Sequence, residues 1–197
     1  MAVLVMVYGQ SGTGKSTSLR NFKNEEVAVV NVSGKPLPFR GDIKPYNSDN
    51  YQKIIAAIQG TDRKSIVIDD ATYLMVNAFM RNAKVVGYQK YTDMAYDFNA
   101  LVEFCANLPE DKIVYFLGHS DQADDGREHF KTIGKMLDEK LTIEGCFDIV
   151  LYCQDHKFYT QANNQSTAKS PEDMFELEIP NDLKAVDVTI RKYYGMK

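Results

Sequence analysis

The sequence predicts an α/β fold in which a mainly parallel central sheet is flanked by helices, with antiparallel additions toward the C-terminus. Five short runs are rich in Val, Ile and aromatic residues and lack the apolar–polar alternation of a half-exposed strand, which is typical of parallel strands buried on both faces. Helix-like stretches separate these runs, so right-handed crossovers are expected to connect them. The composition, 44% apolar and 25% charged in 197 residues, is that of a globular domain.

The regular elements are expected to alternate along the first three quarters of the chain. The expected strands are residues 2–8, 27–32, 65–69, 112–118 and 147–153, and the expected helices are residues 15–23, 49–59, 72–82 and 92–107. Three prolines between residues 36 and 45 follow the second strand and exclude regular structure from that loop. Each element thus has a local sequence signal of its own.

The organisation changes after residue 118. Residues 118–126 are polar and Asp-rich, which predicts a loop, and residues 162–170 are rich in Asn, Gln, Ser and Thr, which predicts a mobile one. Short strands are expected at 128–133, 141–152 and 156–160, and a terminal helix at 183–194 with Asn181 or Asp182 as its N-cap. No linker divides the chain, so residues 1–197 are expected to form one domain.

Composition narrows the function classes. The 27 acidic and 23 basic residues leave a net charge of −4, so any nucleic-acid binding needs a local basic patch or an oligomer. The three cysteines are too few and too scattered for a zinc site or a disulfide framework, which favours a reducing, cytoplasmic location. No apolar run approaches the ~18–20 residues that cross a bilayer, and residues 1–10 lack a basic signal-peptide start, so no membrane partner is expected.

The most specific segment is a glycine-rich loop between the first strand and the first helix. It matches G-x-x-x-x-G-K-[ST] and comprises Gly9, Gln10, Ser11, Gly12, Thr13, Gly14, Lys15 and Ser16. Residue frequencies in this chain make a chance match on the order of half a per cent, before the flanking strand and helix are required. The alternative, a glycine-rich turn with no ligand, is therefore disfavoured.

Each residue type in this loop suits a phosphate. Glycines let backbone N–H groups curl around phosphate oxygens at the start of a helix, where the helix dipole favours anions. Lys15 is expected to neutralise the β- and γ-phosphates, Ser16 to bind Mg²⁺, and Thr17 to contact the α-phosphate. The loop therefore predicts a purine nucleoside triphosphate and Mg²⁺ as cofactors, and it leaves open which purine; ATP is what the resemblance described below implies.

Polar residues also follow two other predicted strands. Asp69 ends strand 65–69, where a carboxylate would hold the Mg²⁺ shell, and Asp70 comes next, where it is a candidate catalytic base or only a helix cap. His119 follows strand 112–118 and is expected to reach the nucleotide crevice as a γ-phosphate sensor, or else to be a surface histidine. No nucleophile elbow accompanies the Ser, His and Asp near residue 120, which excludes a hydrolytic triad.

The order GQSGTGKS, VAVVNV, SIVIDD, IVYFLGHSD resembles the core of RecA-like P-loop ATPases. More closely, the chain resembles the small phage-encoded RecA-like ATPases associated with single-strand annealing and recombination. IGKMLDEKLTIEGCFDIVLYC, AKSPEDMFE and IPNDLKAVDVTIRKYY extend this likeness over nearly the whole chain, although only the first motif is specific by itself.

The resemblance implies that strand 112–118 lies between strands 2–8 and 65–69. It also implies a ring or filament in which the next subunit completes the ATP site with a basic residue. Lys169 is the candidate for that contact, with Arg191 in reserve, and the alternative is a solvated loop lysine. RecA has a catalytic Glu after its second strand, whereas this chain offers Asn31 and Ser33, so slow hydrolysis or a role for Asp70 is expected.

The resemblance also places DNA on the loops that follow strands 65–69 and 112–118. The matching residues combine cations that can screen phosphates with rings that can stack on bases. They are Phe79, Arg81, Lys84, Tyr88 and Lys90, and more weakly Arg127 and Lys131. The alternative is an ordinary solvated helix end with its aromatic rings packed inward.

The leading hypothesis is a protein of phage DNA recombination in the host cytoplasm. ATP binding would order a homo-oligomer on single-stranded DNA, and a slow or DNA-stimulated hydrolysis would release it. A small nucleotide or metabolite kinase is the first alternative, disfavoured because six thinly spread arginines do not suggest a lid. A nucleotide-regulated docking module without turnover is the second. The sequence leaves open whether a ring or a filament forms, and whether a single-strand-binding protein is a partner.

Overall fold

The computed structural model describes residues 1–196, apart from the side chains of residues 138 and 139. The strands are β1 Val3–Gly9, β2 Val27–Asn31, β3 Tyr46–Asn47, β4 Ser65–Asp69, β5 Ile113–Gln122, β6 Glu128–Phe130, β7 Ile149–Gln154, β8 Lys157–Tyr159 and β9 Glu178–Pro180. The helices are α1 Tyr51–Gln59, α2 Thr72–Arg81, α3 Gln89–Ala106 and α4 Leu183–Tyr194. Short turns of helix are η1 Ser16–Asn21, η2 Met136–Leu141 and η3 Ile143–Cys146.

The strands form a single sheet in the order β3-β2-β4-β5-β1-β7-β8-β9, with β6 paired to β5. In the order of the sheet, every neighbouring pair from β3 through β2, β4, β5 and β1 to β7 is parallel. Strands β6, β8 and β9 pair antiparallel. This confirms the predicted fold class. Strand β5 lies between β1 and β4, as the resemblance implied, so the carboxyl ends of these three strands meet at one edge of the sheet.

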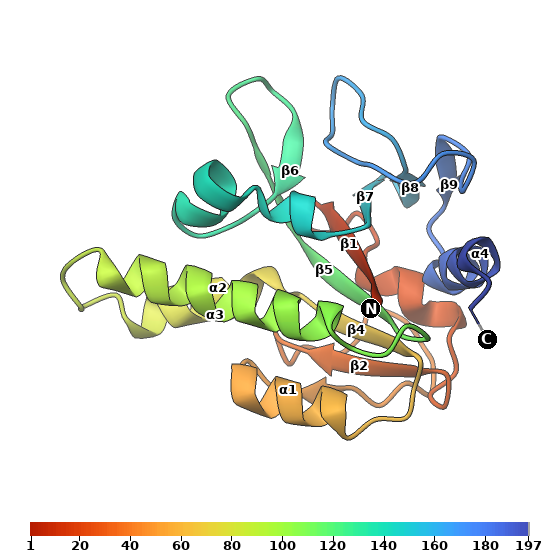
Figure 1. The fold of residues 1–197 in the computed structure, drawn as a ribbon, viewed down its shortest axis with the longest axis horizontal. Coiled ribbons are helices and arrows are strands. Elements are labelled where there is room, and N and C mark those ends of the chain that lie inside the picture. The colour runs from red at the N-terminus through yellow and green to blue at the C-terminus, as the bar shows by residue number, and fades with distance from the viewer. Residues whose placement is uncertain (197) are drawn as a thin grey trace.

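Helices cover both faces of the sheet (Figure 1). Along β1, Leu4 and Met6 belong to the core packed against α1, α2 and α3, whereas Val5 and Val7 belong to the core packed against η1 and α4. Both sets are buried. Burial of alternate residues in two different cores explains why the sequence of β1 is apolar throughout.

Three predicted elements differ in the structure. Residues 15–23 form only the six-residue 3₁₀ helix η1, because Ser16, Thr17 and Ser18 are weak helix formers and the Ser18 hydroxyl bonds the backbone of Lys15. The predicted loop 118–126 is wrong in its first part, since β5 continues to Gln122 by pairing with β6. The predicted strand 141–152 is wrong before residue 149, where η3 follows a left-handed Thr142 (φ 55°).

The C-terminal region contains the predicted helix and a loop that is more fixed than predicted. Helix α4 spans the predicted residues, and Asp182 rather than Asn181 caps it, accepting hydrogen bonds from the amides of Lys184 and Ala185. Residues 162–170 are irregular but tied down, since Lys169 pairs with Val150 of β7 through two backbone hydrogen bonds of 2.8 Å. No helix in the described part of the chain is long and apolar enough to cross a membrane.

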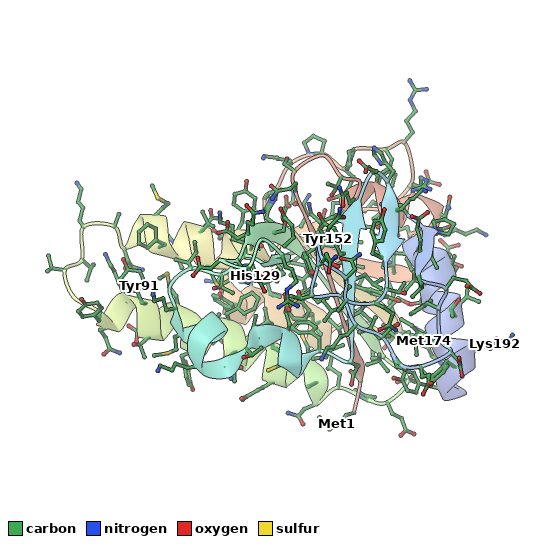
Figure 2. The ribbon with its side chains drawn as sticks, turned by 90° about the horizontal axis from the view of Figure 1, so that it is seen from above. Met1, Tyr91, His129, Tyr152, Met174 and Lys192 are labelled. Atoms are coloured by element: carbon green, nitrogen blue, oxygen red, sulfur yellow. The ribbon has the colours of Figure 1, made fainter. Side chains whose placement is uncertain are left out.

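Helices α2 and α3 form a hairpin that extends beyond the sheet at the left of the view (Figure 1). We call α2, residues 82–88 and α3 the helical hairpin. Figure 2 shows Tyr91 on this projection, well away from Tyr152 on the sheet. Its base packs into the core through Phe98 and Leu101, while the tip carries exposed Val86 and Tyr88.

Candidate functional site

A cavity of about 340 Å³ opens at the edge where β1, β4 and β5 end. The glycine-rich loop, the ends of β2 and β4 and the proline-rich loop after β2 line it, together with the start of α2 and His119 on β5. The lining residues are Ser11, Gly12, Gly14, Lys15, Ser16, Thr17, Asn31, Ser33, Lys35, Pro36, Leu37, Pro38, Asp69, Asp70, Tyr73 and His119. A larger cavity of about 770 Å³ lies at the opposite edge and contains none of the predicted site residues.

Two glycines of the loop have backbones that other residues rarely adopt. Gly12 and Gly14 have φ angles of 85° and 105°, and a Cβ on Gly12 would meet no atom within 4 Å. Gly9 is required for another reason, because its Cβ would come within 2.2 Å of the Cys153 carbonyl oxygen on β7. The loop is therefore open toward the cavity and tightly packed behind it.

Gln10 and Thr13 shape the loop and do not line the cavity. The Gln10 side-chain amide donates to the Glu128 carboxylate at 2.9 and 3.1 Å, and the Thr13 hydroxyl donates to the Gln10 carbonyl at 2.9 Å. Their predicted part in nucleotide binding stays a prediction.

Lys15 is buried within the loop. Its ammonium donates to the carbonyl oxygens of Gly9 and Gln10, each at 2.8 Å. Burial lowers the pKa of Lys15, and the nearby Cys153 thiol and Asp70 carboxylate oppose part of that shift. A phosphate oxygen entering the cavity would replace two neutral carbonyl partners with a charged one, which makes a stronger hydrogen bond.

Ser16 and Asp69 are joined at the floor of the cavity. The Ser16 hydroxyl donates to Asp69 Oδ1 at 2.8 Å. Burial and the neighbouring Asp70 raise the pKa of Asp69 to about 6, against the hydrogen bond from Ser16 and the charge of Lys15. A hydroxyl beside a carboxylate is the hard oxygen pair that Mg²⁺ prefers, so these residues fit the predicted ion. No cluster of three or more His, Cys, Asp or Glu side chains suits a metal among the described residues.

Asp70 and His119 meet on the next side of the cavity. Asp70 has a left-handed backbone (φ 61°), and its Oδ1 lies 3.6 Å from His119 Nε2. The Thr72 hydroxyl accepts a 2.9 Å hydrogen bond from the His119 amide, and the Tyr73 ring packs edge-on against the imidazole, with centroids 5.4 Å apart. Burial, followed by the charge of Lys15, lowers the pKa of His119, so its imidazole is neutral at pH 7 and the pair is not a salt bridge.

The structure adds a support behind the loop that the sequence did not reveal. The Asn181 amide, buried between β9 and α4, donates to the Gly14 carbonyl at 3.0 Å. The His156 amide and the Cys153 thiol both donate to the Thr13 carbonyl, at 3.2 and 3.3 Å. The sequence held one possible signal for this support: α4 needs only one capping residue, Asp182, so the neighbouring Asn181 was free for another role.

The two residues predicted to complete the site of a neighbouring subunit, Lys169 and Arg191, do not line the cavity of their own chain. Lys169 is fixed by its backbone at the outer side of β7. Arg191 is bonded to Asp187, to the Asp111 carbonyl and to the Ser65 hydroxyl at 2.7, 3.0 and 3.0 Å. Because Ser65 begins β4 and Asp69 ends it, Arg191 lies at the edge of the sheet opposite the cavity, where partners of its own chain hold it. Its part in a neighbouring subunit's site stays a prediction.

Most of the predicted DNA-contacting residues are engaged with other side chains of the chain, and two are exposed at the tip of the helical hairpin. Arg81, Arg127 and Lys131 pair with acids of the same chain, namely Asp49, Asp125 and Asp121. Phe79 packs against Tyr91, with Lys90 over both rings, which is the inward packing of the alternative reading. Lys84 and Tyr88 are exposed at the tip of the helical hairpin, Tyr88 by 89%.

A family model described as an AAA domain matches residues 1–172. That span contains the glycine-rich loop, Asp69, Asp70, His119 and the helical hairpin, and it ends before Asn181. No curated protein matches the chain.

Proposed function

The chain belongs to this family of AAA domains, and we propose that it is a Mg²⁺-dependent ATPase whose ATP-bound form assembles on single-stranded DNA in phage recombination. The family and the P-loop NTPase fold indicate a nucleotide-binding ATPase. One observation supports ATP and Mg²⁺ above the others: the Ser16–Asp69 oxygen pair lies in the same cavity as Lys15 and the open glycines.

The geometry suggests how the chain binds a triphosphate. Gly12 and Gly14 leave the loop amides open to phosphate oxygens, and Lys15 needs only to leave the carbonyls of Gly9 and Gln10 to reach them. Mg²⁺, when bound, supplies charge neutralisation at the phosphates, and Ser16 and Asp69 would hold it. Thr17 lines the cavity beyond Ser16, consistent with a contact nearer the α-phosphate.

Hydrolysis requires a group that orients water. Asp70 is our candidate base, and the neutral His119 beside it can hydrogen-bond either a water molecule or the terminal phosphate. Where RecA has a catalytic Glu, this chain offers Asn31 and Ser33, and neither side chain is a carboxylate that could accept a proton. We therefore expect slow turnover in the isolated chain, increased when an oligomer forms on DNA.

Assembly and DNA binding rest on the resemblance and on the helical hairpin. Its tip offers Lys84 and Tyr88, a cation and a ring, to a single strand. Since α2 begins two residues after Asp70, the hairpin is directly connected to the nucleotide site. Lys169 remains our candidate for a contact with the nucleotide of a neighbouring subunit.

The test combines ATP turnover and oligomer size, each measured with and without single-stranded DNA. We expect turnover to rise and larger species to appear when DNA and ATP are both present. Lys15→Ala should abolish nucleotide binding, while Lys44→Ala, an exposed lysine outside the cavity, should not change it. Phosphoryl transfer to a nucleoside monophosphate would instead identify a kinase, and nucleotide binding without turnover on DNA would identify a docking module.

A further inference from the structure

The loop after β2 is built around a buried asparagine. Asn31 is 2% exposed. Its amide nitrogen donates to the Lys35 carbonyl at 2.7 Å, and its Oδ1 accepts from the Gly34 amide at 2.9 Å and from the Ser33 hydroxyl at 3.1 Å. Gly34 completes the turn with a φ of 67°. Asn31 is thus engaged in shaping residues 33–35, which leaves the carboxylate role of the RecA-like enzymes without a substitute on β2.

This turn places Lys35 at the nucleotide cavity. Lys35 lines it together with Lys15, Asp69 and Asp70. Its ammonium lies 5.7 Å from the centre of the Tyr73 ring, and that ring packs on His119. The charge of Lys35 also contributes to lowering the pKa of His119, so its field reaches the imidazole. Lys35 therefore stands on the Asp70–His119 side of the cavity.

The negative charges expected in the cavity exceed the single positive charge of Lys15, so a second cationic side chain would be stabilising there. Asp69 and Asp70 are adjacent carboxylates, and an ATP molecule brings several further negative charges to a site whose P-loop provides one lysine. Residues 33 and 35–38 also line the cavity, and they follow β2, which β4 and β5 separate from β1 and its glycine-rich loop. A cation presented from this loop can meet the terminal phosphate where charge builds up during transfer.

We propose that Lys35 is a second phosphate-binding cation of this site, supplied by the same chain and directed at the terminal phosphate of ATP. The proposal rests on the proposed ATPase function and deepens it. It gives the monomer a means to distinguish ATP from ADP before any neighbouring subunit arrives. A cation–π contact of a solvated lysine with Tyr73 is the alternative role.

The test measures affinities for ADP and for a slowly hydrolysed ATP analogue, each with Mg²⁺, at a dilution where light scattering shows monomers. Lys35→Met removes the charge and keeps the apolar stem, Lys35→Arg keeps the charge, and Lys44→Met is the matched control from the same loop. A lost charge-assisted hydrogen bond should weaken analogue binding about 10-fold or more in Lys35→Met. ADP affinity should stay within about twofold, and Lys35→Arg should recover most of the loss.

Three results would overturn the proposal. Equal losses of ATP-analogue and ADP affinity would show a structural role, and unchanged affinities would show a solvated lysine. Recovery of turnover on mixing Lys35→Met chains with Lys15→Ala chains would show that Lys35 acts on a neighbour's nucleotide. The ATPase assignment fails separately: the wild-type chain would then bind no nucleotide, or Lys15→Ala would bind it normally, and the Lys35 proposal would fall with it.

Discussion

The nucleotide cavity and the helical hairpin are adjoining parts of the same molecule with opposite construction. The cavity is held by segments distant in sequence, since Asn181 bonds to Gly14 and Ser16 bonds to Asp69. The tip of the hairpin makes its contacts locally, as between Phe79 and Tyr91, and leaves Val86 97% exposed. The cavity is therefore preformed in the folded chain, whereas the tip exposes apolar and basic side chains to solvent.

The strongest test of a preformed cavity is the loss of chemistry without the loss of binding. The Asp70 side chain makes no capping hydrogen bond to α2, and Asp70→Asn keeps its size but removes a proton acceptor. We expect turnover to fall about 10²–10⁴-fold with nucleotide affinity nearly unchanged. Single-turnover kinetics with equilibrium binding would measure both, with Asp62→Asn as an exposed control. Hydrolysis at the wild-type rate would transfer the base role away from Asp70.

The cavity should also carry a cost in stability, through the buried carboxyl of Asp69. Because the pKa of Asp69 is raised from 3.8 to about 6, the folded state binds more protons than the unfolded state between these pH values. The free energy of unfolding therefore falls as pH rises from about 4 to about 6. Asp69→Asn removes this dependence.

At pH 7, Asp69→Asn should be more stable than the wild type by on the order of 2 to 3 kcal/mol, while binding Mg²⁺–nucleotide more weakly. Urea unfolding of the ligand-free protein in EDTA at pH 4.5 and pH 7 measures the difference, with Asp62→Asn as the control. Parallel pH profiles for wild type and Asp69→Asn would contradict the raised pKa.

The support behind the glycine-rich loop can be tested through Asn181. Asn181→Ala removes the side-chain hydrogen bonds with Gly14, Arg20 and Cys153, and it leaves the Gly14 carbonyl with the Ser18 amide alone, which costs about 1–3 kcal/mol of stability. If the bond also positions the loop, nucleotide affinity should fall about 10-fold at temperatures where the variant is fully folded. Asn164→Ala, at an exposed site, is the control. Lower stability with wild-type affinity would make Asn181 a purely structural residue.

The smallest expected effect concerns the tip of the helical hairpin. Lys84→Ala with Tyr88→Ala should weaken single-strand binding several-fold and lower the salt dependence of log K by about 0.7 for the lost phosphate contact. Arg81→Ala should matter less, because its guanidinium is already paired with Asp49. Titration with a fluorescent oligonucleotide at several salt concentrations measures both. DNA affinity untouched by the double change would place the DNA contact elsewhere on the molecule.

The predictions that the structure confirms rest on patterns within a few consecutive residues. The strand that holds Asp69 was predicted with its observed bounds, and the glycine-rich loop was recognised because its residue types and spacing are contiguous. Predictions failed where pairing partners decide the structure. Polar residues 119–122 remain in a strand because β6 pairs with them, and the apolar stretch before residue 149 turns at Thr142.

By itself, the sequence determined the order of strands and helices, the phosphate-type loop and the carboxylates that follow β4, because each depends on neighbours within a few residues. Only the tertiary structure decided that Asn181 supports the loop, that Arg191 is engaged at the far edge of the sheet, and that Lys35 shares a cavity with Lys15. Asn181 and Gly14 are 167 positions apart, and no spacing rule links them. They meet because β7, β8 and α4 pack beside β1, and such contacts are set by the burial of whole elements rather than by any short motif.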